Sequence, residues 1–357
     1  MSDLVDWPFA AKVATRVAAR RPGLAGYERR ALEADLVELT AQAEGLVAEE
    51  TGLVSAAGPA RARITDRPGW VEANVASFQR LLRPVTEKLE AAQSMSPLPR
   101  AVGAHLSGTQ VGLLLGWMST RVLGQYDQLL IEDERPEEQD IVYYVGPNIV
   151  GLERRFGFPP REFRLWLALH EVTHRAQFTG VPWMRDHFLS LVNNTLEGVD
   201  PDPRRLFEAL QRAVEEIRGG RNPLDEGGLL TLLATPEQYQ AIQEIAGLMS
   251  LLEGHGDVTM NRAAADRIPN AGRFSRVLHE RRQQTGLTKV ITSLIGLDAK
   301  LRQYAQGEAF IEAVEAAGGP QLLARVWDAP EWLPTWPEIR EPQRWIERAT
   351  PGALAAG

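Results

Sequence analysis

Residues 163–178 read FRLWLALHEVTHRAQF, and this stretch decides how the chain is interpreted. It contains no Gly or Pro, and its apolar residues recur at the i, i+3 and i+4 spacing of a helix with a buried face. Pro159 and Pro160 precede it, at the place where proline favours the first turn of a helix. Within the expected helix His170 and His174 are four residues apart, so both imidazoles lie on the same face.

Two imidazoles one helical turn apart can bind a single cation. Glu171 is angled away from that cation but can reach a water bound to it. The pattern His-Glu-x-x-His therefore predicts a metal-activated water, with His170 and His174 as ligands and Glu171 as the catalytic general base. The alternative is a pair of core histidines with ordinary hydrogen-bond partners, since a buried imidazole without partners is unfavourable.

The composition limits the classes of protein to consider. A chain of 357 residues, of which 44% are hydrophobic and 24% are charged, can bury a sizeable core. A formal net charge of -8 argues against a nucleic-acid partner, because nucleic-acid binders present a basic surface. The absence of Cys excludes thiolate zinc sites, disulfides and cysteine nucleophiles. Any zinc must therefore be held by His and carboxylate ligands.

Neither a signal peptide nor a membrane segment is expected. Residues 1–7 carry acidic side chains and lack a long apolar core, which indicates a mature cytoplasmic protein. Residues 101–122 are rich in apolar and small side chains, with Gly108, Gly112 and Gly116 at the spacing that lets helices approach closely. Polar residues interrupt this stretch, so we interpret it as a buried helix whose glycines admit a neighbouring helix, and we expect no membrane partner.

Helical patterns recur along the chain, whereas strand signals are scarce. The best strand signal is the β-branched and aromatic run at 140–145, which Gly146-Pro147-Asn148 closes. We predict a mainly α, multi-helix fold with at most a small β element. The predicted helices span 7–19, 26–49, 70–93, 98–124, 160–178, 183–194, 203–218, 236–262, 271–284 and 298–317.

We expect a single domain over residues 1–357. It comprises a helical N-terminal part (1–135), a metal-binding part (136–318) and a C-terminal strap (319–357). Residues 327–345 contain four Trp and four Pro, which is more typical of an extended strap laid over the core than of a new domain.

A zinc site with two histidines needs a third protein ligand. Glu253 and Asp257 lie at i and i+4 in the segment 251–260, and Glu253 continues the apolar stripe of the preceding turns. We expect Glu253 to be the third ligand and Asp257 to orient a ligand histidine by accepting its other ring N–H. His255 points away from Glu253 on a regular helix and is the competing third ligand, with Asp257 as a further alternative.

This pattern, His-Glu-x-x-His followed at a distance by Glu-x-x-x-Asp, resembles the gluzincin branch of zinc metallopeptidases. More closely, the chain is similar to a bacterial family of zincin-like hydrolases associated with deazaflavin coenzyme biosynthesis. The resemblance implies a zincin-like fold, a zinc cofactor and hydrolase activity. It covers most of the chain, through residues 111–112, 122–127, 145–148, 166–178, 253–255 and 300–304 together with Gly307 and Phe310.

The chain departs from the wider zincin pattern at Arg175, because that pattern prefers uncharged residues around the two histidines. Arg175 either faces outward or places a buried guanidinium near the cation. The second case would oppose the cation and indicate altered metal use.

The expected reaction is hydrolysis of an acyl bond. Glu171 takes a proton from the attacking water and gives it to a leaving amine, so peptides and amides are the expected substrates. Candidates for stabilising the oxyanion are Tyr304, Arg302, His255 and His187, although packing or ion pairing also explains each of them.

Two other functions share parts of this sequence pattern. One is a catalytically silent zincin that acts as a binding module. The other is a di-metal helix bundle, which needs a second Glu-x-x-His that the sequence lacks. The sequence does not decide the oligomeric state.

Overall fold

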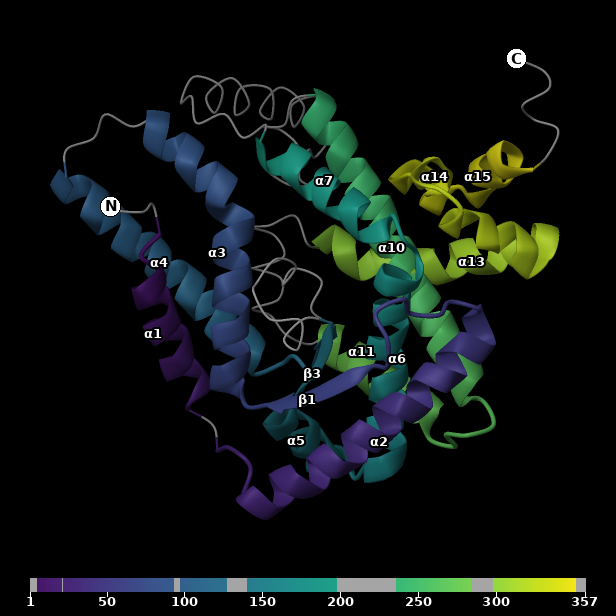
Figure 1. Cartoon of the computed structure of the whole chain (residues 1–357), viewed down its shortest axis with the longest axis horizontal. Coiled ribbons are helices and arrows are strands. Elements are labelled where there is room, and N and C mark those ends of the chain that lie inside the picture. The colour runs from purple at the N-terminus through teal and green to yellow at the C-terminus, as the bar shows by residue number, and fades with distance from the viewer. Residues whose placement is uncertain are drawn as a thin grey trace. The chain divides into compact units, whose positions relative to one another are not determined.

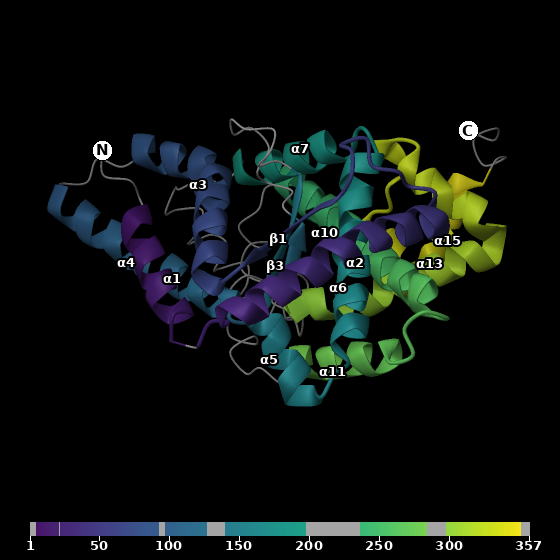
Figure 2. The same ribbon diagram turned by 60° about the horizontal axis from the view of Figure 1, so that its bottom comes forward.

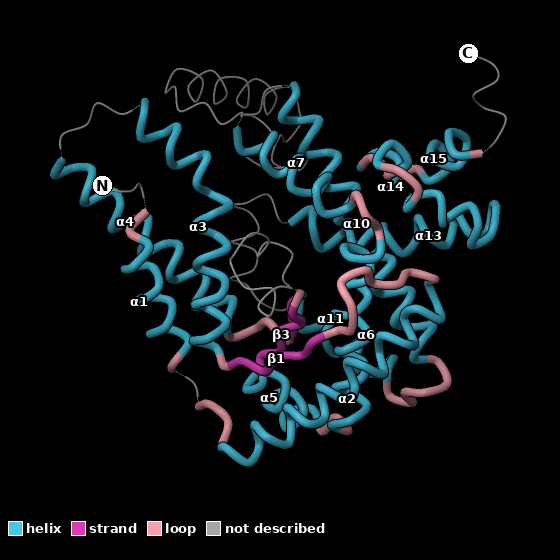
Figure 3. The backbone as a smooth tube through the Cα atoms, viewed as in Figure 1, coloured by secondary structure: helices cyan, strands magenta, loops and turns pink. Residues whose placement is uncertain are grey.

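The computed structural model describes residues 5–20, 22–92, 97–126, 140–197, 236–283 and 298–350. Helices dominate, and the strands of the described residues are confined to one small sheet (Figure 3). The mainly α prediction is therefore confirmed, while the helix predicted at 203–218 lies outside the described residues.

The chain divides into two compact units. The first comprises Met1–Gly180 with Thr259–Phe274, and the second comprises Val181–Val258 with Ser275–Gly357. That the chain is a single domain stays a prediction.

The first unit combines a small sheet with helices. The sheet has the strand order β1-β3-β2, with β1 parallel and β2 antiparallel to β3. Helix α2 lies alongside β1 and α6 (Figures 1 and 2). The elements are α1 (Trp7–Ala18), α2 (Gly26–Thr51), β1 (Arg61–Thr65), α3 (Arg67–Ala92), α4 (Pro97–Ser119), β2 (Gly124–Tyr126), β3 (Ile141–Val145), α5 (Gly146–Phe156) and α6 (Pro160–Gly180).

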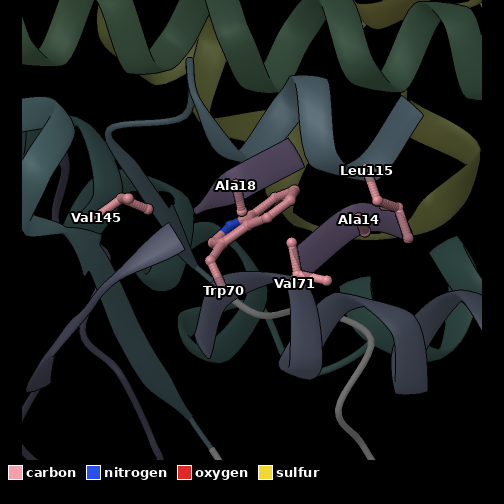
Figure 4. Close-up of a cluster of buried hydrophobic side chains, with 6 residues drawn as sticks. All are labelled: Ala14, Ala18, Trp70, Val71, Leu115 and Val145. Atoms are coloured by element: carbon pink, nitrogen blue, oxygen red, sulfur yellow. The ribbon is translucent and has the colours of Figure 1, made fainter. Parts of the chain in front are cut away.

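Helices α1, α3 and α4 of this unit pack against one another around a buried apolar cluster (Figure 4). The glycines of α4 admit α1 as expected: a Cβ at Gly112 would lie 2.5 Å from the Ala10 carbonyl oxygen, and one at Gly108 would lie 2.6 Å from that of Asp6. The apolar cluster between these helices consists of Ala14, Ala18, Trp70, Val71, Leu115 and Val145.

No helix within the described ranges combines the length and apolar character needed to span a bilayer.

The predicted strand at 140–145 is confirmed as β3, but three neighbouring elements were not foreseen. The helix predicted to reach residue 124 ends at Ser119, and Gly124 instead begins the short strand β2. Strand β1 was not predicted, although Arg61-Ala62-Arg63-Ile64-Thr65 alternates polar and apolar residues. Gly146-Pro147-Asn148 begins helix α5, because a proline that lacks its N–H fits the first turn of a helix without loss.

The second unit is helical in its described parts. The interpretation of residues 327–345 as an extended strap is wrong, because they form short helical turns. Pro330, Pro337 and Pro342 each stand in the first turn of a short helix, where their missing N–H does no harm. The elements are α7 (Met184–Glu197), α10 (Pro236–Ala264), α11 (Ala271–Gln283), α13 (Asp298–Ala324), η2 (Arg325–Trp327), η3 (Pro330–Trp332), α14 (Trp336–Arg340) and α15 (Pro342–Ala349); α10 and α11 have their residues 259–274 in the first unit.

Helices α10 and α13 approach closely at two glycines. A Cβ on Gly254 would collide with the backbone of Gly307, and one on Gly307 would collide with the Ser250 carbonyl. The glycine that directly follows Glu253 is thus explained by helix packing.

Candidate metal centre

The two histidines of α6 face each other through the ring nitrogens expected to bind a cation. His170 Nε2 and His174 Nε2 are 3.3 Å apart, and their ring planes are nearly perpendicular, at 84°. Residues i and i+4 of a helix stand one above the other, which accounts for this approach. Two nitrogen lone pairs directed at one point are what a shared cation needs.

Gln177 sets the tautomer of His174. The Gln177 Oε1 atom lies 2.9 Å from His174 Nδ1, and an amide oxygen can only accept a hydrogen bond. Nδ1 therefore carries the proton, which leaves the Nε2 lone pair for a cation. Gln177 is fully buried on α6. Its spacing of three residues from His174 was the available sequence signal, but Gln177 was not among the predicted site residues.

His170, His174 and Glu253 form a group that could hold a metal ion. Each offers one ligand atom, all of these atoms lie within 4.8 Å of one another, and all three residues are half-buried. Among the residues that the structure describes, this is the one group of three or more potential ligands found. Imidazole nitrogens and a carboxylate are suitable ligands for zinc and leave a fourth position open. This group consists of the three residues predicted as ligands, and their binding of a metal stays a prediction.

Glu171 is more enclosed than the histidines beside it, with 6% of its surface exposed. It lies against β2, where a Cβ on Gly124 would be 2.6 Å from Glu171 Oε1. Tyr144, the residue opposite Gly124 on β3, is also near Glu171. Burial raises the pKa of the Tyr144 phenol above its usual range, the hydrogen bond with Thr40 (2.9 Å) opposes this rise, and the Glu171 charge adds to it. Tyr144 is therefore a neutral neighbour of Glu171.

Arg175 neither faces outward nor leaves an unpaired positive charge. It is 1% exposed. Its Nη2 donates to Asp140 Oδ2 (2.6 Å) and to the Gly58 carbonyl (2.6 Å), Nε donates to Asp140 Oδ1 (3.0 Å), and Nη1 donates to Glu44 Oε1 (2.6 Å). Two carboxylates thus balance the guanidinium, so the expectation that a buried Arg175 would oppose the cation is wrong.

Among the described side chains, the other candidates His255, Asp257 and His187 are not part of the three-residue group. His255 is buried with its ring edge-on to Trp327, at a centroid distance of 5.0 Å. Asp257 is half-buried on α10. Burial lowers the pKa of His187, which favours a neutral imidazole, and its ring packs edge-on to Trp183. Arg302 and Tyr304 belong to the α13 backbone, but their side chains lie outside the described residues.

Comparisons with known proteins indicate the family of this chain. A family model described as zincin-like metallopeptidase matches residues 5–346. No curated protein matches the chain. A crystal structure from Chloroflexus aurantiacus, described as "a putative hydrolase with a novel fold", is 33% identical, with a TM-score of 0.72 over 96% of this chain and 98% of that one. The chain therefore belongs to the zincin-like metallopeptidase family.

Proposed function

We propose that this chain is a zinc-dependent hydrolase of peptide or amide bonds in which Glu171 is the general base. The observation that carries the proposal is the group of His170, His174 and Glu253, with the enclosed Glu171 directly after His170 on the same helix. The alternative function is a binding module that keeps the site without turnover.

The ligand set fits zinc in number and in type. Two neutral imidazoles and one carboxylate are a common set for catalytic zinc, and the sequence contains no Cys that would indicate a structural site. The hydrogen bond from His174 Nδ1 to Gln177 supports the neutral, Nε2-binding tautomer. A zinc ion held there would supply Lewis acidity, acidifying a water and polarising the substrate carbonyl.

The protein's own part in the reaction is proton transfer. Glu171 accepts the proton of the attacking water as the water oxygen bonds to the carbonyl carbon. The C–N bond then breaks, and Glu171 returns the proton to the leaving nitrogen. The enclosure of Glu171 beside Gly124 supports this role, because a carboxylate shielded from bulk water keeps one orientation.

The test combines metal content with turnover. Wild type is expected to bind one zinc per chain by elemental analysis, and His170→Ala and Glu253→Ala are expected to lose it. His105→Ala, which removes an exposed histidine paired with Asp6, should keep a full equivalent. A full zinc equivalent in His170→Ala would place the metal elsewhere and refute the proposal.

Turnover is measured on a peptide and amide library with zinc content matched between variants. Glu171→Gln should retain zinc and lower kcat on the order of 10²- to 10⁴-fold, the usual contribution of a general base. Glu162→Gln is the matched control, since Glu162 is on the same helix but bonds to Asn270. Equal turnover in wild type and Glu171→Gln would refute the mechanism, and no turnover in either would favour the binding module.

Peptides or amides as partners, the absence of a nucleic-acid or membrane partner, the cytoplasmic location and the association with deazaflavin coenzyme biosynthesis stay predictions. The oligomeric state stays open.

A further inference from the structure

The sheet approaches α6 very closely at Gly124. A Cβ placed there would lie 2.6 Å from Glu171 Oε1 and 2.7 Å from both Cδ and Cγ. Real Cβ atoms do not approach other atoms so closely, so Glu171 in its present position requires glycine at 124. The φ angle of Gly124 is not in the left-handed region, which means that space and not backbone conformation imposes this requirement.

The backbone at Gly124 is fixed by hydrogen bonds on both sides. Before it, Asn148 Nδ2 donates to the carbonyls of Ser119 (2.8 Å) and Val122 (2.7 Å), and the Val145 N–H donates to Leu123 O (2.8 Å). Arg67 Nε in turn donates to Asn148 Oδ1 (2.8 Å). The segment leading into β2 is therefore held by buried groups and cannot move away from Glu171 at little cost.

The residue after Gly124 is anchored as well. Gln125 Oε1 accepts from Trp70 Nε1 (2.7 Å), and Gln125 Nε2 donates to Asn74 Oδ1 (3.1 Å). On the neighbouring strand Tyr144 stands opposite Gly124 and is held by Thr40. When two packed groups compete for one space, the more flexible one moves, and here that is the Glu171 side chain.

We propose that Gly124 is a positioning residue for Glu171: close packing of the β2 backbone fixes the orientation of this carboxylate. The contact between Gly124 and Glu171 is observed in the structure, whereas its importance for catalysis rests on the proposed function. Gly124 acts through Glu171, without a chemical role of its own.

A double-mutant cycle in urea unfolding tests the contact without any substrate or metal. Gly124→Ala is expected to raise the unfolding equilibrium constant at least tenfold in the wild-type background. It should raise the constant less than threefold in the Glu171→Ala background, where the added methyl group has room. Gly151→Ala on α5 is the control, because a Cβ there meets nothing within 4 Å. If Gly124→Ala has the same effect in both backgrounds, the contact is not what requires glycine and the inference fails. Should Gly124→Ala alone not fold, recovery of folding in the double variant supports it.

The positioning role is tested with acetohydroxamate, a zinc chelator whose hydroxyl proton needs a nearby carboxylate to accept it. Calorimetry on zinc-loaded protein should give an affinity at least tenfold weaker for both Gly124→Ala and Glu171→Gln, each with one equivalent of zinc, and an unchanged affinity for Gly151→Ala. An unchanged affinity in Gly124→Ala alone overturns the inference and leaves the proposed function standing. An unchanged affinity in Glu171→Gln refutes the assignment of Glu171 as the general base. If the double-mutant cycle in urea still shows coupling between Gly124 and Glu171, their contact then contributes to stability alone.

Discussion

Replacing Arg175 by Met would remove a guanidinium that joins α6 to three other parts of the first unit. Its N–H groups bond to Asp140, to Glu44 on α2 and to the Gly58 carbonyl. The thioether would fill much of the space but could satisfy none of these acceptors. The carboxylates of Asp140 and Glu44 would then face each other without the intervening charge.

The magnitude follows from how deeply the partners are buried. Asp140 is 8% exposed and loses three of the hydrogen bonds to Arg175, whereas Glu44 is 30% exposed and also accepts from the Ala60 N–H. Water can therefore solvate Glu44 in part, but it reaches Asp140 poorly. Removing one partner of a buried ion pair destabilises by about 3–5 kcal/mol, and Asp140 should account for most of this loss. This loss is a large fraction of the free energy of unfolding of a typical protein, which is ~5–15 kcal/mol.

Urea unfolding at neutral pH measures the effect. Arg175→Lys should be intermediate, because an ammonium group cannot present the planar donors that Asp140 and Gly58 accept. Asp140→Asn in the Arg175→Met background should recover part of the loss by removing the unpaired charge. Arg161→Met is the control on the same helix, with exposed ion pairs worth about 0–1 kcal/mol. A loss for Arg175→Met as small as that of the control would refute the argument.

Further outcomes follow from other parts of the structure. Gln177→Leu should weaken zinc binding by about 10- to 100-fold in a competition titration, because His174 loses the acceptor that fixes its tautomer; equal affinity would contradict this. Gly112→Val should lower the free energy of unfolding by at least about 1–3 kcal/mol, since the side chain would meet the α1 backbone; a neutral effect would show that α1 can move away. Burial raises the pKa of Glu338, but the Arg348 guanidinium and the Thr335 N–H outweigh it and hold the pKa below its ordinary value of 4.5. Glu338 therefore stabilises the fold above that pH and stops doing so as the pH falls through its folded pKa, so the stability difference from Glu338→Gln should close in acid unfolding curves; a constant difference would count against the pairing.

The features that could be predicted from the sequence are those that depend on local spacing. The α6 helix and the facing pair of His170 and His174 follow from residues within one helix, and the β-branched run of β3 is equally local. The apolar stripe of α10 gave Glu253 as the expected third ligand, and the group found in the structure contains it.

The surroundings of these residues could not be predicted, because they come from distant positions. Arg175 is 35 residues from Asp140 and 131 from Glu44, so no local pattern indicates that its charge is balanced. Strand β2 has three residues, too few for an alternating pattern, and Gly124 needs to be glycine only because Glu171 lies against it. Pro147 was misread because proline suits both a turn and the first turn of a helix.

The parallel pairing of β1 with β3 also bears on how this protein folds. Arg61 pairs with Ile141, 80 residues later, so the ends of a long chain segment must meet before the strands can bond. The backbone hydrogen bonds within a helix such as α6 join residues only four positions apart, so helical segments can begin to form sooner. During synthesis β1 must wait for its partner, and its unpaired edge is the part of the first unit most exposed to self-association in that interval. The sheet that carries Gly124 is thus completed late, after the helix that carries the histidines.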